Sequence, residues 1–274
     1  VPVFEHVLRT SPQGAGMRGS ICIAAHGKPA HLLRTLESIY RQPAAWDFDA
    51  VETIVVDDRS EDDEIREVCE AFPAQYVRLD GPPDYRNPSR ARNEAYKRAS
   101  GDVIIAQSDD VVHVTEDAVE RLASELTPGR FVISTVYNTD FDGRRVPGNL
   151  ENPEYAPLVY YTGLKNPRPF FFLGALYRRD LYAVGGNDEE FTAPGREDDW
   201  FAQCLVRGCG LKPVWSPTIV GHHLQHKHLG TKEASAPSYA LYRRKYADAS
   251  SGRIAWQAAG GSWPYSEGVP LVHE

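Results

Sequence analysis

The stretch VIIAQSDDVVH, residues 103–113, joins a strand signal directly to a pair of acidic residues. Val103 to Ala106 suit a buried strand, and Asp109 and Asp110 follow after only two polar residues. Carboxylates at the end of a core strand are expected where that end faces a ligand or solvent. The stretch therefore indicates either a binding site or a solvated acidic turn.

Around this stretch, apolar segments that suit strands alternate with segments of helical periodicity. Such alternation is typical of an α/β fold, in which a parallel sheet carries helices on both faces. Ligands of these sheets bind outside the carboxyl ends of the strands. The residues expected at that edge are His26, Asp57, Asp58, Asp109 and Asp110. The expected strands are 20–25, 51–56, 74–79, 102–107 and 130–136, and the expected helices are 29–42, 64–72, 88–99 with Asn87 as cap, and 115–126 with Thr115 as cap.

The composition limits the classes of protein to which the chain can belong. Its net charge is −8 over 274 residues, whereas general nucleic-acid binders usually carry a basic surface. No run approaches the roughly 20 apolar residues of a membrane span, and no N-terminal segment resembles a secretion signal. The four cysteines lack the spacing of a zinc knuckle, and we interpret them as reduced thiols of a cytoplasmic protein.

The chain also lacks the glycine-rich loops that usually hold phosphates. Neither GxGxxG nor GxxxxGK[ST] follows an expected strand, which counts against a dinucleotide dehydrogenase and a P-loop NTPase. A divalent cation can bridge phosphate oxygens instead, and one or two carboxylates suffice to hold it. Asp109 and Asp110 suit that role.

Three segments resemble, in order and spacing, the nucleotide-binding half of family 2 glycosyltransferases with the GT-A fold. They are SICIAAHGKPAHLLRTLESIYRQ (20–42), ETIVVDDRSEDD (52–63) and RNPSRARNEAYKRASGDVIIAQSDD (86–110). The family commonly shows Pro-Thr-Tyr-Asn after the first strand, then Val-Asp-Asp-Gly-Ser, Ala-Arg-Asn and a metal-binding DxD motif. The resemblance covers roughly residues 20–225. It implies a Rossmann-like half with a mostly parallel sheet, fused to an acceptor-binding half.

On this resemblance the chain is expected to have three parts. Residues 1–19 form a loose lead-in. Residues 20–230 form the GT-A domain, with the nucleotide half at about 20–136 and the acceptor half at about 137–230. Residues 231–274 form a C-terminal extension, whose Tyr and Trp residues suit an acceptor surface, a homo-oligomer contact or ordinary core.

The resemblance further implies positions for a nucleoside diphosphate and a metal ion. Gln107 stands where the family usually has the first Asp of DxD, and it would bind a ribose hydroxyl instead of the metal. Asp109, with Asp110 as partner, would hold Mn²⁺ or Mg²⁺. The residues implied in nucleotide binding are Ala24, Ala25 and His26 at the base, Asp57 and Asp58 at the base or ribose, Arg92 near the diphosphate, and Gln107 and Ser108.

A second acidic cluster lies in GGNDEEFTAPGREDDWFAQCLVRGCG, residues 185–210. Acids at a helix start suit the helix dipole, but inverting glycosyl transfer also needs a carboxylate as general base. The segment resembles the Gly-Gly-x-Asp-x-x-Phe and Glu-Asp region of the same family, and the Gly-Gly-Glu-Asp stretch of β-1,4-galactosyltransferases and chondroitin-synthesising enzymes. The resemblance implies Asp198 as the base and Glu197 as a ligand of a sugar hydroxyl. Further donor-sugar or acceptor contacts are implied for Gly174, Ala175, Asp188, Asp199 and Trp200.

Four histidines lie close together in IVGHHLQHKHLG, residues 219–230. A strand is expected to end at Val220 or Gly221, so a His-rich surface loop is one interpretation. Neutral imidazole also binds Mn²⁺-like ions beside carboxylates. The resemblance points to His222 as a further metal ligand. The lesser candidates are His223 and His226.

Together these observations predict a metal-dependent, inverting glycosyltransferase. It would move one sugar from a nucleotide-diphosphate donor, UDP-linked, to a hydroxyl of a carbohydrate or other acceptor. One alternative is a sugar-phosphate nucleotidyltransferase, which shares the acidic metal site but opens with a Gly-rich loop. AAHGKPAH (24–31) offers only Gly27 and Lys28 for such a loop. The other alternative is a non-catalytic nucleotide- or carbohydrate-binding protein on the same fold.

Overall fold

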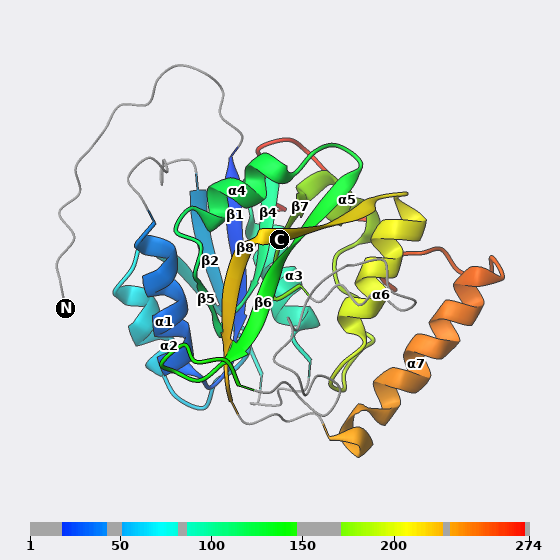
Figure 1. Ribbon diagram of the computed structural model, residues 1–274. Helices are drawn as coiled ribbons and strands as arrows, with labels where there is room; N and C mark the ends of the chain where they lie inside the picture. Colours follow the sequence, from blue (N-terminus) through cyan, green and yellow to red (C-terminus); the bar gives the residue numbers. More distant parts are fainter. Residues whose placement is uncertain (1–17, 43–50, 82–86, 147–170, 227–230, 272–274) are drawn as a thin grey trace.

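The computed structural model describes residues 18–42, 51–81, 87–146, 171–226 and 231–271. In these ranges, helices surround a single 8-stranded sheet (Figure 1). The strands are β1 (Gly19–Ala25), β2 (Val51–Asp57), β3 (Ala74–Arg78), β4 (Val103–Ser108), β5 (Val111–His113), β6 (Arg130–Thr139), β7 (Leu173–Tyr177) and β8 (Lys212–Leu224). The helices are α1 (Pro29–Tyr40), α2 (Glu64–Glu70), α3 (Ser89–Arg98), α4 (Ala118–Glu125), α5 (Arg178–Val184), α6 (Glu197–Gln203) with a π-helical turn at Cys204–Gly208, and α7 (Lys232–Ser250).

The sheet has the strand order β3-β2-β1-β4-β7-β6-β8-β5. β3, β2, β1 and β4 are parallel to one another. β7 is antiparallel to both of its neighbours, so β6 and β8 point the same way as the first four strands. Among the described strands, β7 and β5 alone run in the opposite direction. The fold is therefore the α/β class with a mostly parallel sheet that the alternation predicts.

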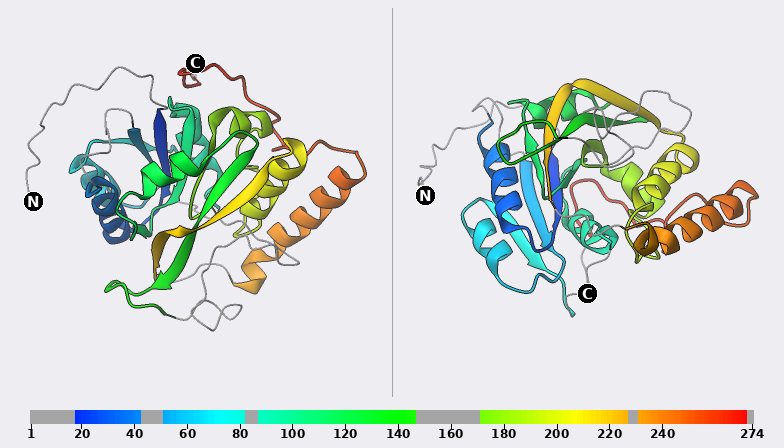
Figure 2. Two further views of the ribbon diagram at one scale, coloured as in Figure 1. Left: turned by 45° about the horizontal axis from the view of Figure 1, so that its top comes forward. Right: turned by 60° about the horizontal axis from the view of Figure 1, so that its bottom comes forward.

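The order of the first four strands explains why helices cover both faces of the sheet. The connections from β1 to β2 and from β2 to β3 step one way along the sheet, whereas the connection to β4 steps back past β1. Right-handed crossovers then place α1 and α2 on one face and α3 on the other, as Figure 2 shows. The carboxyl ends of β1, β2 and β4 meet at one edge between these helices.

The position of β7 between β4 and β6 was not predicted. Along the chain, β6 is the next long strand after β4, and β7 comes only after β6. Gly174 of β7 pairs with Ala106 of β4 on one side and with Ile133 of β6 on the other. A Cβ atom on Gly174 would lie 2.7 Å from the carbonyl oxygen of Val132, which is closer than real Cβ contacts. The glycine therefore lets β6 approach β7 at this point.

Several element ends differ from those expected, and two of these differences involve β8. The hydroxyl of Thr115 donates to the carbonyl oxygen of Thr218 (3.1 Å) and accepts from the N–H of Val220 (2.9 Å). Thr115 thus binds β8 instead of capping α4, and the helix begins only at Ala118. β8 itself does not end near Val220 but continues to Leu224, because its last residues pair with both β5 and β6.

The chain after α7 returns across the domain and is held there by buried contacts (Figure 1). Arg178 is fully buried, and its guanidinium donates to the carbonyl oxygens of Ser266 (2.9 Å) and Val269 (2.6 Å). A Cβ atom on Gly185 would lie 1.9 Å from the carbonyl oxygen of Gly261. The close approach of the C-terminal segment therefore requires glycine at position 185.

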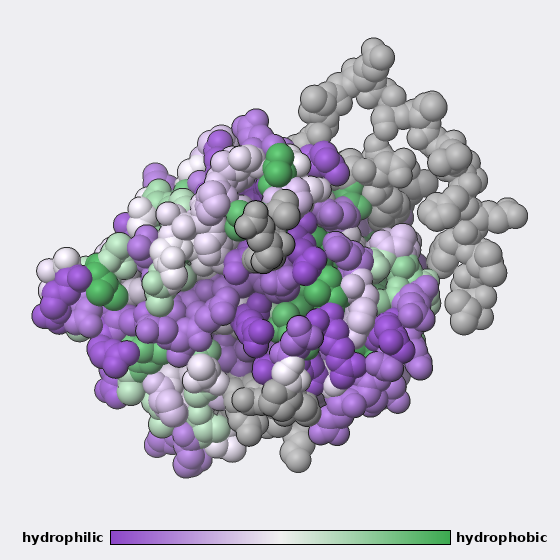
Figure 3. Space-filling view, turned by 180° about the vertical axis from the view of Figure 1, so that it is seen from behind, coloured by the Kyte–Doolittle hydropathy of each residue, from purple (hydrophilic) through white to green (hydrophobic). Residues whose placement is uncertain are grey.

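The surface seen from behind is mostly hydrophilic, with hydrophobic residues in several separate places (Figure 3). No helix in the described ranges is long and apolar enough to cross a membrane.

Candidate active site

The turn after β1 is bonded directly to the end of β2. His26 Nδ1 lies 2.9 Å from the carbonyl oxygen of Asp58, which can only accept, so Nδ1 carries the proton. The N–H of Gly27, a residue with φ of 57°, donates to Ser60 Oγ (3.0 Å). The N–H of Asp58 donates to the carbonyl oxygen of Ala25 (2.8 Å). These bonds fix the two strand ends side by side at the predicted edge.

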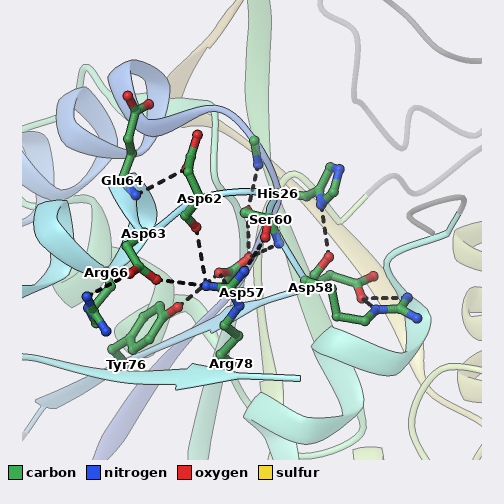
Figure 4. Close-up of polar contacts among 12 residues, drawn as sticks. His26, Asp57, Asp58, Ser60, Asp62, Asp63, Glu64, Arg66, Tyr76 and Arg78 are labelled. Carbon is green, nitrogen blue, oxygen red and sulfur yellow. Dashed lines mark hydrogen bonds and ion pairs between the residues drawn. The ribbon is translucent and has the colours of Figure 1, made fainter. Parts of the chain in front are cut away.

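The carboxylate of Asp57 accepts hydrogen bonds from other residues of the protein. Its Oδ1 accepts from the N–H (2.9 Å) and the hydroxyl (2.6 Å) of Ser60, and its Oδ2 accepts from the hydroxyl of Tyr76 (2.9 Å) (Figure 4). Burial, followed by the bond to Asp57, raises the pKa of Tyr76 to about 12. Through these bonds Asp57 supports the turn after β2.

Asp58 differs from Asp57 in having one carboxylate oxygen without a partner among the described residues. It is 1% exposed, and its Oδ1 forms an ion pair with Arg59 at 2.7 Å. Its Oδ2 has no hydrogen-bond partner within the described part of the chain. A buried acceptor without a partner costs about 1–3 kcal/mol. A base N–H or a ribose hydroxyl would satisfy this oxygen.

The acidic pair after β4 is buried and faces Lys28. The Lys28 ammonium lies 2.7 Å from Asp109 Oδ1 and 2.5 Å from Asp110 Oδ2. Asp109 Oδ2 also accepts from the N–H of His26 at 3.4 Å. Burial opposes the charged form of Lys28, but the two carboxylates outweigh it and raise the pKa of the ammonium above its usual value. A solvated acidic turn, the alternative interpretation, is therefore wrong.

Asp110 also belongs to a group that could hold a metal ion, together with His223 and His226. One ligand atom from each of the three residues lies within 4.8 Å of the others. Asp110 Oδ2 is 3.1 Å from His226 Nε2, and Asp110 Oδ1 is 3.5 Å from His223 Nε2. Two imidazoles and a carboxylate are a donor set suited to Mn²⁺-like ions.

The orientation of His223 supports this assignment. His223 Nδ1 lies 2.7 Å from Asn138 Oδ1, and this contact orients the ring so that Nε2 faces Asp110 Oδ1 at 3.5 Å. Asp110 Oδ1 is buried and has no hydrogen-bond partner among the described residues. A buried oxygen without a partner, beside an imidazole whose other nitrogen is held by an amide, suits a bound cation.

His222 does not join this group. Successive residues of a strand point to opposite faces of the sheet, and β8 continues through both His222 and His223. His222 lies instead beside Gly143, and burial together with Arg145 lowers its pKa. Because the strand is longer than expected, the lesser candidate His223 takes the position that the sequence assigned to His222.

The side chain of Gln107 is bonded to residues of β5. Its Nε2 donates to the carbonyl oxygen of Val111 (3.0 Å), and its Oε1 accepts from His113 Nε2 (2.9 Å). His113 Nδ1 accepts from Gln42 Nε2 (2.9 Å), and burial lowers the pKa of His113 to about 4, so the ring is neutral. Gln107 therefore fixes the turn between β4 and β5 and does not point at a ribose. Ser108 and Ala24 pair across β4 and β1, and both are partly exposed.

The second acidic cluster lies in the first turn of α6. Asp198 forms an ion pair with Arg92 of α3, and Glu197 Oε2 accepts from Asn87 Nδ2 (3.1 Å). Burial, followed by the charge of Asp198, raises the pKa of Glu197 to about 7. Asp199 binds Arg196 at 2.7 Å. The structure thus brings both candidate catalytic carboxylates against residues of the nucleotide half.

Other residues predicted to contact the donor sugar or the acceptor are buried in the interior. Asp188 is fully buried and pairs with Lys245 of α7 at 2.8 Å. Trp200 is fully buried with its ring 5.5 Å from that of Trp256. Gly174 and Ala175 are buried in β7. Lys28, Asn87 and Asn138 were missed, because no local pattern shows that their side chains reach Asp110, Glu197 and His223.

Comparison with solved structures identifies the fold as GT-A. A mannosyltransferase, PcManGT from Pyrobaculum calidifontis, in complex with GDP-Man and Mn²⁺, has a TM-score of 0.56 and 16% identity over 87% of this chain and 65% of its own. S. aureus TarS has a TM-score of 0.59 and 16% identity, over 85% of this chain and 39% of its own. GalNAc-T7 with UDP, GalNAc and Mn²⁺ has a TM-score of 0.58 and 16% identity, over 85% of this chain and 50% of its own. The chain thus spans between 39% and 65% of the length of these structures.

The sequence comparison agrees with the structural one. No curated protein matches the sequence. The model of the family described as glycosyl transferase family 2 matches residues 20–185, which is more than half of the chain. The chain therefore belongs to glycosyl transferase family 2.

Proposed function

We propose that this protein is a metal-dependent, inverting glycosyltransferase that transfers a sugar from a UDP-linked donor to an acceptor hydroxyl. The observation that carries the proposal is the cluster of Asp110, His223 and His226, together with the buried, unpartnered carboxylate oxygen of Asp58. The solved relatives are complexes with GDP-Man and Mn²⁺, with UDP, GalNAc and Mn²⁺, and, for TarS 1-349, with UDP-GlcNAc.

The nucleotide edge would recognise the donor through side chains that are already oriented. Asp58 Oδ2 accepts from a base N–H or a ribose hydroxyl, and Arg59 holds the other oxygen of the same carboxylate. Asp110, His223 and His226 would hold Mn²⁺, with Mg²⁺ a poorer match to two imidazoles. The cation would neutralise the diphosphate of the leaving group.

The carboxylates of α6 would supply the base. In inverting transfer, Asp198 takes the proton of the acceptor hydroxyl while that oxygen attacks the anomeric carbon and the nucleoside diphosphate leaves. Arg92 faces Asp198 and orients it. Glu197, held by Asn87, is the adjacent group that would bind a sugar hydroxyl.

Calorimetric titration with UDP, GDP, dTDP and CDP, each with and without Mn²⁺, tests the donor site. We expect one nucleotide to bind tightly only with Mn²⁺, and the Asp58→Asn and His226→Ala variants to lose that binding. The His222→Ala variant is the matched control, since His222 lies on the opposite face of β8. If no nucleotide binds under either condition, the proposed donor site is wrong.

A second assay tests the reaction class. Transfer or hydrolysis of the sugar from the nucleotide that binds is expected to fall by about 10²–10⁴-fold in Asp198→Asn. Release of pyrophosphate from a nucleoside triphosphate and a sugar phosphate would favour a nucleotidyltransferase instead. Tight nucleotide binding with no turnover in any assay would favour a non-catalytic binding protein.

A further inference from the structure

The contact between Lys28 and the acidic pair joins residues that are 82 positions apart in the sequence. The lysine follows the turn His26–Gly27, which is bonded to Asp58 and Ser60, and it stands at the N-cap of α1. Its backbone position is therefore fixed, and its side chain extends inward toward β4. The fold therefore fixes this contact, which differs from a chance contact between two flexible surface side chains.

The two carboxylates that Lys28 binds are almost completely enclosed. Their side chains are 5% and 2% exposed, whereas that of Lys28 is 24% exposed. Buried carboxylates require a partner of opposite charge. Lys28 provides that charge to both at once, so it acts as an internal counter-cation.

Lys28 and the candidate metal group share one atom. Asp110 Oδ2 is the oxygen that the Lys28 ammonium approaches at 2.5 Å, and it is also the oxygen that His226 Nε2 approaches at 3.1 Å. A dication and an ammonium repel each other at such distances. Both cannot occupy this oxygen together.

We propose that Lys28 is a displaceable counter-cation that must leave Asp110 before a divalent cation can bind there. This inference rests on the metal centre of the proposed function. It also predicts a source of cooperativity, because the phosphates of a nucleotide offer the displaced ammonium another anionic partner. Nucleotide and divalent cation should then strengthen each other's binding, and Lys28 should carry part of that coupling.

The test is a Mn²⁺ titration, followed by the electron paramagnetic resonance of the free ion, with and without UDP. Wild type, Lys28→Met and Lys212→Met are compared. Lys212 is an exposed residue at the opposite end of β8 from His223, so its variant removes the same charge from the chain without touching the site.

We expect Lys28→Met to bind Mn²⁺ at least about tenfold more tightly than wild type without nucleotide, since the buried carboxylates lose their internal cation. The factor by which UDP strengthens Mn²⁺ binding should fall by a similar amount. Lys212→Met should match wild type in both. Equal Mn²⁺ affinity and equal coupling in wild type and Lys28→Met would overturn the role of Lys28 while leaving the metal centre intact. Absence of Mn²⁺ binding in every form, with or without UDP, would overturn both.

A measurement on the unmodified protein keeps the inference testable if Lys28→Met does not fold. The lysines of the wild-type protein are acetylated only partially, by a short reaction, with and without Mn²⁺. Mass spectrometry then measures the extent of acetylation at each lysine. Lys28 should react faster once Mn²⁺ is added, because it loses its ion pair with Asp110. Lys245, which pairs with Asp188 away from the metal group, is the internal control. An unchanged rate at Lys28 under saturating Mn²⁺ would contradict the displacement.

Discussion

Arg92 of α3 forms an ion pair with Asp198 in the first turn of α6, and the pair joins α3 to the candidate catalytic carboxylates. Both side chains are mostly buried. Asn87, just before α3, makes the parallel contact to Glu197. The start of one helix thus orients the start of the other, and a single arginine balances two adjacent carboxylates.

The first prediction concerns the pH dependence of activity. The pKa of Glu197 is about 7 because burial and the charge of Asp198 raise it more than Arg92 lowers it. Arg92→Ala removes the lowering charge, so the acid limb of kcat/KM against pH should move upward by about one pH unit or more. Arg90→Ala, an exposed arginine on the same helix, is the control and should leave the limb in place. An acid limb that moves equally in both variants would show that its position depends on the net charge of the protein and not on the contact of Arg92 with the carboxylates.

The second prediction concerns stability. The pKa of Glu197 is raised from 4.5 in the unfolded chain to about 7 in the folded protein, so the folded state holds its proton more strongly. The stability from this group is complete below pH 4.5 and is lost as pH rises to 7. Glu197→Gln should therefore raise the free energy of unfolding by up to about 3 kcal/mol near pH 8 and by little at low pH.

Urea unfolding at several pH values measures this difference. Gln retains an oxygen that can accept from Asn87, so the substitution removes the charge and keeps the hydrogen bond. Glu61→Gln, at an exposed position, should show no such pH dependence. A constant difference between Glu197→Gln and wild type at every pH would rule out ionisation as its cause.

The sequence predicted the parallel half of the sheet well, because apolar runs and helical periodicity are local signals. It could not predict that β7 lies beside β4, since pairing across the sheet depends on packing between distant segments. The error at Thr115 has the same origin: a hydroxyl suited to a helix cap found a partner on β8 instead.

The candidate site shows a similar division. The acidic pairs were found because they directly follow strands, and that rule needs only the local pattern. The choice between His222 and His223 depended on whether β8 continues through both residues, because neighbouring residues of a strand point to opposite faces of the sheet. Lys28 gave no signal, because its partners lie 82 residues away in the sequence.

The third prediction concerns Asn138, which orients His223 through a 2.7 Å hydrogen bond. Asn138→Ala should weaken Mn²⁺ binding by about 10–100-fold, because a ligating imidazole depends on the partner of its other nitrogen. Asn138→Asp keeps the acceptor and should retain binding close to that of wild type. Titration of Mn²⁺ in the presence of the nucleotide measures both. Loss of binding in the Asp variant as well would mean that Asn138 acts through the fold and not through His223.

The fourth prediction concerns the segment after α7. Arg178 is fully buried and donates to the carbonyl oxygens of Ala99, Ser266 and Val269. Arg178→Met keeps much of the apolar volume but leaves these carbonyl oxygens without the donor, so the free energy of unfolding should fall by about 3 kcal/mol or more. Arg179→Met, the exposed neighbour on α5, should change it by less than about 0.5 kcal/mol. Limited proteolysis should also cut the chain after Ser250 faster in Arg178→Met, because two of the three lost bonds hold that segment against the domain. If Arg178→Met unfolds like wild type and its C-terminal segment is equally protected, the segment is held by its aromatic contacts alone.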